Sequence, residues 1–253
     1  MATEPSFEIT APTDRRPGST LVVGLSTPGL AGLTAADYLV RHLDAEEIGA
    51  VIPDGLPAIA PFEAGVPRHP TRLFDLVGSP LAVLVGELYV PPPVAHPFVD
   101  GLRDWARRAG VEEVAMLHGV PYPHDESEHA VYHVATPGYR DRHFDDEAVP
   151  PLGGGVLDGV VGELVGRALE DDALEVGVYV TPTHPPGPDV EASLRLIDAL
   201  EGRYGFDIDP AELEALADRL GRYHAELADR MEALAQAEAP IGSREFPEDR
   251  MYM

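Results

Sequence analysis

The sequence contains no cysteine and no lysine, and only 7% of its 253 residues are aromatic. The absence of cysteine excludes disulfide bonds, thiol catalysis and cysteine metal sites. A Walker loop is excluded as well, because it needs a lysine on the phosphates, and an ATP-dependent ligase is disfavoured for the same reason. All of the positive charge is carried by arginine.

Positive charge is also scarce, since 18 arginines face 44 acidic residues and give a formal net charge of −26. Such an excess repels phosphates and therefore opposes binding of nucleic acid or anionic membranes. Spread over a folded surface, it suits a protein that stays soluble in concentrated salt, where screening removes the self-repulsion. We expect a halophilic archaeal protein. A disordered acidic chain is excluded by the strong apolar periodicity.

Long hydrophobic runs are missing too. No apolar run approaches the roughly 20 residues that a membrane helix needs. Residues 1–18 are polar and lack the apolar centre of a signal peptide, so we expect them to form a flexible N-terminal segment. These observations predict a cytoplasmic protein without a membrane partner.

From residue 19 to residue 208, strand-like and helix-like segments alternate. An unbroken aliphatic run such as Leu81–Val85 suits a strand that is covered on both faces. The other expected strands are 21–25, 48–52, 114–117, 131–135 and 176–180, and the expected helices are 32–43, 98–109, 156–169 and 190–204. The alternation predicts one α/β core domain with a three-layer, mostly parallel sheet.

The expected helix 156–169 contains three glycines, at positions 159, 162 and 166. Glycine inside a helix costs roughly 1 kcal/mol relative to alanine. We therefore expect this ridge to allow close approach of another backbone.

The segment after residue 208 has a different pattern. Asp209 is a good N-cap and Pro210 fits the first turn, so a long C-terminal helix is expected over 209–239. Its apolar stripe is long enough for oligomerisation, or for covering the chain's own sheet. The stripe consists of Leu213, Leu216, Leu220, Tyr223, Leu227, Met231 and Leu234. Residues 240–253 are polar and contain proline and glycine, which predicts a flexible tail.

The tail ends in Met251, Tyr252 and Met253. Protein stability does not require two methionines and a tyrosine at a solvated end. A partner can fill one pocket with the ring and neutralise the terminal carboxylate with a basic group. A hydrophobic residue followed by tyrosine and any residue ends roughly one chain in a hundred by chance, so the tripeptide needs support from the rest of the chain.

The glycines between the first core strand and its helix are Gly24, Gly29 and Gly32. Their spacing is not the dinucleotide fingerprint, and Pro28 interrupts it, so cofactor binding is disfavoured. The segment stays a candidate ligand or interface loop. Residues 153–155 are three glycines that could form an anion nest, although a flexible turn is the better interpretation.

Five histidines lie among carboxylates between residues 118 and 143, at positions 118, 124, 129, 133 and 143. Such residues could bind zinc. No H-E-x-x-H or H-x-x-E-H pair is present, however, and dense charge is typical of a solvated loop. We predict a solvated acidic loop, no metal and no cofactor. The G-x-S-x-G elbow of α/β-hydrolases is absent, so that chemistry lacks its nucleophile.

Several segments, taken in order, resemble the PAC2-type family of proteasome assembly chaperones. Residues 24–32 and the Tyr38-Leu39 helix resemble the opening of the family. The resemblance continues through Gly86-Glu87, the helix 98–105, Leu117-His118-Gly119, the glycine-rich stretch 155–166, Asp189 with Ala192, 196–200 and Ile208-Asp209. It covers about residues 19–220.

This resemblance implies an α/β fold related to nucleoside phosphorylases, used as a homo-oligomeric, cofactor-free scaffold and not as an enzyme. Archaeal members are regarded as chaperones or activators of the proteasome core particle. Some members end in a hydrophobic-tyrosine-any motif that docks between α-subunits of the ring, and Met251, Tyr252 and Met253 match it at each position. The leading hypothesis is therefore a protein that binds the proteasome α-ring through its tail.

Two alternatives remain open. One is an enzyme on a phosphorylase-like scaffold that acts on a nucleoside or small anionic substrate near residues 24–32. The other is a scaffold for an unrelated partner, bound through the helix 209–239.

Overall fold

The central strand of the sheet is β2 (Thr20–Leu25), in which all six residues are buried. It pairs in parallel with β7 (Leu81–Gly86) on one side and with β8 (Glu113–Val120) on the other. Beyond β8 lies β10 (Glu175–Pro182), which is also parallel. Aliphatic runs suit these positions because both faces of a parallel sheet are covered. The computed structural model describes residues 5–11, 16–56, 58–122, 124–125, 128–145, 148–171, 173–184 and 187–217.

The flanking strands are antiparallel. The order in the eight-stranded sheet is β1-β3-β6-β7-β2-β8-β10-β9. The added strands are β1 (Ser6–Thr10), β3 (Ala45–Asp54), β6 (Thr71–Leu76) and β9 (Tyr132–Ala135). The parallel arrangement predicted from the sequence therefore holds for the four central strands, and the sheet as a whole is mixed. Separately, β4 (Phe62–Glu63) and β5 (Val66–Pro67) form a two-stranded hairpin.

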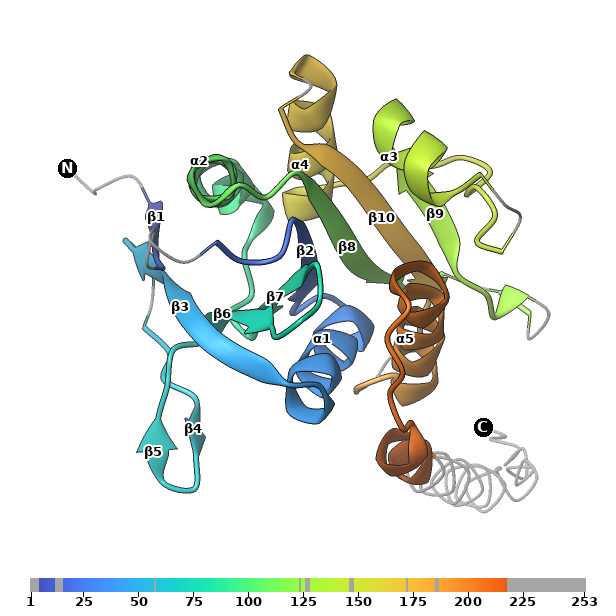
Figure 1. Cartoon of the computed structure of the whole chain (residues 1–253), viewed down its shortest axis with the longest axis horizontal. Coiled ribbons are helices and arrows are strands. Elements are labelled where there is room, and N and C mark those ends of the chain that lie inside the picture. Colours follow the sequence, from blue (N-terminus) through green and yellow to red (C-terminus); the bar gives the residue numbers. More distant parts are fainter. Residues whose placement is uncertain are drawn as a thin grey trace, which may run out of the picture. The chain divides into compact units, whose positions relative to one another are not determined.

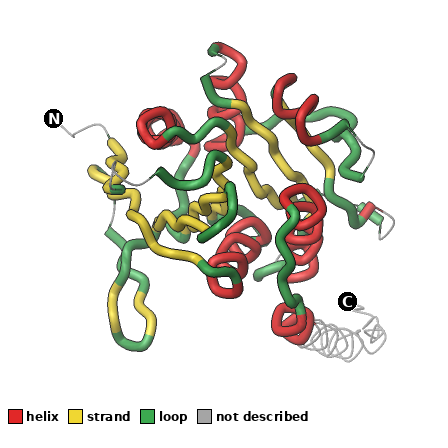
Figure 2. The backbone as a smooth tube through the Cα atoms, in the orientation of Figure 1, coloured by secondary structure: helices red, strands yellow, loops and turns green. Residues whose placement is uncertain are grey.

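Helices cover both faces of the sheet, as Figures 1 and 2 show. On one face, α1 (Ala31–His42) packs beside α5 (Val190–Tyr204). On the other face, α2 (Ala95–Ala109), which follows the short 3-10 turn η1 (Pro92–Val94), packs beside α4 (Gly159–Glu170). The short helix α3 (Pro137–His143) follows β9 and contacts β10. The arrangement has the three layers that alternating strands and helices predict.

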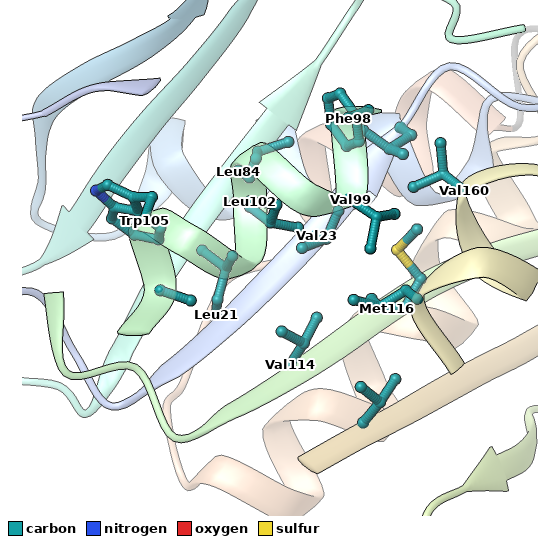
Figure 3. Close-up of a cluster of buried hydrophobic side chains, with 14 of the residues drawn as sticks. Leu21, Val23, Leu84, Phe98, Val99, Leu102, Trp105, Val114, Met116 and Val160 are labelled. Atoms are coloured by element: carbon teal, nitrogen blue, oxygen red, sulfur yellow. The ribbon is translucent and has the colours of Figure 1, made fainter. Parts of the chain in front are cut away.

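A large apolar cluster lies between the sheet and the α2–α4 layer (Figure 3). Phe98, Leu102 and Trp105 recur at spacings of three and four on α2, and each is at most 3% exposed. They face strand residues such as Leu21 and Met116. Burying a side chain of this size contributes about 1.5–3 kcal/mol, so this layer is a major source of stability.

The structure describes part of the N-terminal segment and only the first residues of the expected C-terminal helix. Residues 6–10, inside the segment predicted to be flexible, form β1 and pair with β3. Phe7 is 7% exposed, and its ring meets Phe98 edge to face with centroids 5.2 Å apart. Residues 211–217 are helical, and the remainder of the predicted helix 209–239 and the tail 240–253 lie outside the described residues. No helix in the described part is long and apolar enough to cross a membrane.

Candidate functional site at the carboxyl ends of the parallel strands

Three connections leave the carboxyl ends of β2, β8 and β10. In open α/β sheets, ligands bind outside this edge of the strands. The connections are residues 26–30, which lead into α1, residues 121–131, which lead to β9, and residues 183–189, which lead into α5.

Two glycines of the 24–32 segment have a packing role. A Cβ on Gly24 would lie 2.2 Å from the carbonyl oxygen of Gly32, and a Cβ on Gly32 would lie 2.2 Å from the carbonyl oxygen of Leu117. Both neighbours are backbone atoms that cannot move aside cheaply. These glycines therefore let α1 approach β2 and β8 closely, and the spacing that fails to match a dinucleotide loop has a structural explanation.

The rest of the segment packs against the β10–α5 connection. Gly29 has a φ of +78°, and a Cβ there would lie 2.7 Å from the Cβ of Thr183. The carbonyl oxygen of Gly29 accepts the N–H of Asp189 at 2.8 Å. Pro28 faces the neighbouring strand, where a Cβ on Gly119 would lie 3.4 Å from its carbonyl oxygen. Pro28 and Gly29 thus form an interface between elements of the chain itself.

Asp189 organises the β10–α5 connection. As the N-cap of α5, it accepts the N–H of Ala192 on Oδ1 at 2.9 Å and the N–H of His184 on Oδ2 at 2.8 Å. Burial alone would raise the pKa of Asp189, but these N–H donors and the His184 ring outweigh it and lower the pKa. The carboxylate is ionised at neutral pH.

Three histidines converge beside this connection. One nitrogen each from His124, His129 and His184 lies within 4.8 Å of the other two. The ring centroids are 4.7 to 5.1 Å apart. Sequence reasoning had placed the first two in one segment and had not considered His184, because its approach depends on the pairing of β8 with β10, in which Val120 is level with Pro182.

The other histidines of the 118–143 segment lie elsewhere. His118, near the end of β8, has its pKa lowered by burial, which outweighs the charge of Asp158. His133 is buried on β9, stacks on Phe144 and hydrogen-bonds through Nδ1 with a backbone carbonyl. His143 bonds Glu113, at the opposite end of β8. The five histidines therefore do not form one site.

Two cavities lie near these elements. One, of about 600 Å³, is lined mainly by apolar side chains and by the three glycines 153–155, and includes Val120, Tyr122 and Val180. The other, of about 540 Å³, lies along α4 and includes His96 and Arg167. Neither is lined by a residue of the 24–32 segment. The tail residues Met251, Tyr252 and Met253 lie outside the described residues.

The mixed sheet, its two helical layers and the glycine-packed loops define an α/β scaffold. A family model described as the PAC2 family matches residues 21–228, and the chain belongs to this family. No curated protein sequence matches the chain significantly.

Solved structures share the fold over most of their length. Pyrococcus furiosus PbaA, an archaeal homolog of proteasome-assembly chaperone, superposes with a TM-score of 0.78 at 19% identity, over 92% of this chain and 95% of its own. Pyrococcus furiosus PbaB, an archaeal proteasome activator, gives 0.74 at 17% identity, over 88% and 99%. A Thermoplasma acidophilum protein of unknown function gives 0.71 at 22% identity, over 89% and 91%.

Proposed function

We propose that this protein binds the α-ring of the proteasome core particle and acts there as an assembly chaperone or activator in an archaeal, halophilic cytoplasm. The observation that carries the proposal is membership of the PAC2 family over residues 21–228, combined with the terminal Met251, Tyr252 and Met253. The roles named for PbaA and PbaB support it.

In this proposal the tail makes the contact. Tyr252 fills a pocket between α-subunits, Met251 packs beside it, and the carboxylate of Met253 pairs with a basic residue. Concentrated salt screens the ion pair, so burial of the ring contributes more of the affinity. A single tail binds weakly. A homo-oligomer that presents several tails gains by avidity, and the helix 209–239 is proposed as the stalk that carries each tail.

The remainder of the chain is proposed as a scaffold related to nucleoside phosphorylases. The packing of Gly24 and Gly32 against backbone atoms supports a structural role for the 24–32 segment. The same packing disfavours an enzyme with its substrate at this loop, since the close approach leaves no room beside these glycines.

The test is co-sedimentation with archaeal proteasome α-rings in concentrated salt. The full chain is compared with three tail variants. One lacks residues 251–253, one carries Tyr252→Ala, and one is extended by two glycines, which moves the terminal carboxylate away from the tyrosine side chain. Tyr89→Ala is the matched control, because Tyr89 is a 57% exposed tyrosine on the surface of the folded domain and outside the tail. We expect the three tail variants to lose binding and the control to keep it. Equal binding by all chains would refute the tail mechanism.

A further inference from the structure

The histidine cluster of His124, His129 and His184 has the composition of a metal site. Each ring offers one nitrogen, and the three nitrogens lie within 4.8 Å of one another. We propose that the cluster binds one divalent transition-metal ion, with Zn²⁺ as the preferred ion. The proposal concerns a site that is separate from the tail and does not depend on the proteasome.

The hydrogen bonds of two rings leave one nitrogen of each ring free to bind a metal. Nδ1 of His124 lies 2.6 Å from the carbonyl oxygen of Tyr122, which can only accept, so Nδ1 carries the proton and Nε2 has a free lone pair. That Nε2 is buried and has no hydrogen-bond partner. Buried polar atoms nearly always have a partner, and a metal ion would supply the one that is missing.

His184 is held in the same way. Its Nδ1 lies 3.0 Å from Oδ2 of Asp189, so the carboxylate accepts the Nδ1–H and Nε2 is left as the ligand. A carboxylate behind a metal-binding imidazole fixes the ring and raises its basicity. Asp189 is itself fixed by the N–H groups of Ala192 and His184. The support of this ligand is therefore already in place.

The distances are compatible with one ion. Two Zn–N bonds of about 2.1 Å at a tetrahedral angle place their nitrogens about 3.4 Å apart. The nitrogens need to draw together by at most about 1.4 Å from the 4.8 Å limit. Two of the histidines lie in the connection 121–131, so rotation of their side chains can supply this movement.

Charged groups of both signs lie around the cluster. Arg195 and Glu191 act on His129 with opposite sign, and the Arg195 guanidinium is engaged by Thr181 Oγ1 at 3.1 Å and by the carbonyl of Pro182 at 2.9 Å. The ionised Asp189 adds negative charge behind His184.

The donor set selects the ion. Imidazole suits Zn²⁺ and its neighbours, whereas Ca²⁺ and Mg²⁺ need oxygen ligands. Within the described part of the chain, the cluster has no fourth protein ligand. Because the His184 side chain is 54% exposed, water reaches the ion and completes its coordination. The bound ion would join the β8–β9 connection to the β10–α5 connection.

The experiment uses the full chain, freed of metal with a chelator and titrated with ZnCl₂ in a calorimeter. We expect one tight site, with affinity reduced at least about tenfold in His129→Ala and in His184→Ala. Asp189→Asn should also weaken binding, and it keeps an N-cap because asparagine caps helices as well as aspartate does. The matched control is His69→Ala, which removes an exposed histidine outside the cluster.

Surface carboxylates are the competing explanation, because the chain carries 44 acidic residues in all. X-ray absorption of the zinc-loaded protein distinguishes coordination by the three histidines from coordination by carboxylates. We expect the scattering pattern of imidazole rings. Circular dichroism confirms that each variant is folded. Coordination by oxygen alone, absence of a tight site, or equal affinity in His184→Ala and His69→Ala would overturn the proposal.

Discussion

Glu113 is a buried carboxylate that joins three segments of the chain. Its side chain is 8% exposed. It accepts the Thr20 hydroxyl at 2.7 Å, Nη1 of Arg142 at 2.6 Å and Nε2 of His143 at 2.8 Å. Its partners come from β2 and α3, so the loss of this one β8 side chain takes away an acceptor that donors from two other elements share.

Replacing Glu113 with alanine should therefore lower the free energy of unfolding by about 1–3 kcal/mol, the usual cost of leaving a buried hydrogen-bonding group without its partner. The measurement is urea denaturation. The neighbouring Glu112→Ala serves as control, since Glu112 is exposed and a surface change of this kind stays within about 0.5 kcal/mol. Similar losses in both variants would contradict the role given to the network.

The network also predicts a dependence on pH. Burial would raise the pKa of Glu113, but the bonds from His143, Thr20 and Arg142 outweigh it and lower the pKa below its usual value of 4.5. A depressed folded-state pKa means that the stabilisation is complete above the unfolded pKa and is lost as the pH falls through the folded one. The difference in unfolding free energy between wild type and Glu113→Gln should shrink below pH 4.5. A difference that is constant down to acid pH would contradict this.

Among the elements, α4 corrects one expectation. Its glycines were predicted to let another backbone approach, yet only Gly162 meets a backbone, and it is that of the residues leading into α4, since a Cβ there would lie 2.3 Å from the carbonyl oxygen of Leu157. A Cβ on Gly166 or on Gly159 would have no neighbouring atom within 4 Å. Gly159 differs in its backbone, which has a φ of +56°, in the left-handed region. The sequence spacing identified the ridge but could not tell which of its members is packed.

The contrast between an unpacked glycine of α4 and a closely packed glycine of β2 leads to a paired prediction. Gly166→Ala should raise the free energy of unfolding by about 0.5–1 kcal/mol, because alanine favours the helix and meets open space. Gly24→Ala should lower it by about 1–3 kcal/mol, because the new methyl group overlaps the backbone of α1. Chemical denaturation of the two variants measures both changes in the free energy of unfolding. A destabilised Gly166→Ala would mean that this face of α4 is covered in solution, as it would be in an oligomer.

The success of sequence reasoning also varied between elements. The helix 190–204 was predicted with its observed bounds, since Asp189 caps it and Gly205 ends it in the left-handed region. β6 was missed because Arg72 and Asp75 interrupt its apolar pattern. Arg72 is only 8% exposed, and its charge reaches Asp37 and Glu47 at 3.8 Å. Partners from other elements allow a polar residue in a buried strand, and local patterns do not contain that information.

The same limit applies to the candidate site. The glycines of the 24–32 segment could be located from sequence, because a strand and a helix enclose them. The convergence of His184 on His124 and His129 could not, because it follows from the strand order and not from spacing along the chain.

For the molecule as a whole, the net charge of −26 makes thermal stability depend on the salt concentration. Screening shortens the Debye length from about 10 Å at 0.1 M to about 3 Å at 1 M salt, which weakens the repulsion between surface carboxylates. The melting temperature should rise over this range by at least about 2–4 °C, the shift that 1 kcal/mol produces in a domain of this size. Differential scanning calorimetry in NaCl provides the measurement.

A charge variant serves as the control for the salt effect. Glu112, Asp207 and Glu214 are exposed, and changing all three to the corresponding amides removes negative charge without opening the core. This variant should melt above the wild type in low salt and gain less from added salt. An equal gain in both proteins would show that salt acts through hydrophobic burial and not through screening.

The position of β2 at the centre of the sheet has a consequence for how the chain folds. Thr20 and Glu113 are paired neighbours although they are 93 residues apart in sequence. By contrast, β6 and β7 are consecutive and joined by a short turn. Closing long loops slows folding, so the β6–β7 hairpin can form early while the pairing of β2 with β8 forms late. During synthesis, β2 leaves the ribosome long before β8 has been made. The edge of β2 that pairs with β8 therefore stays unpaired until then.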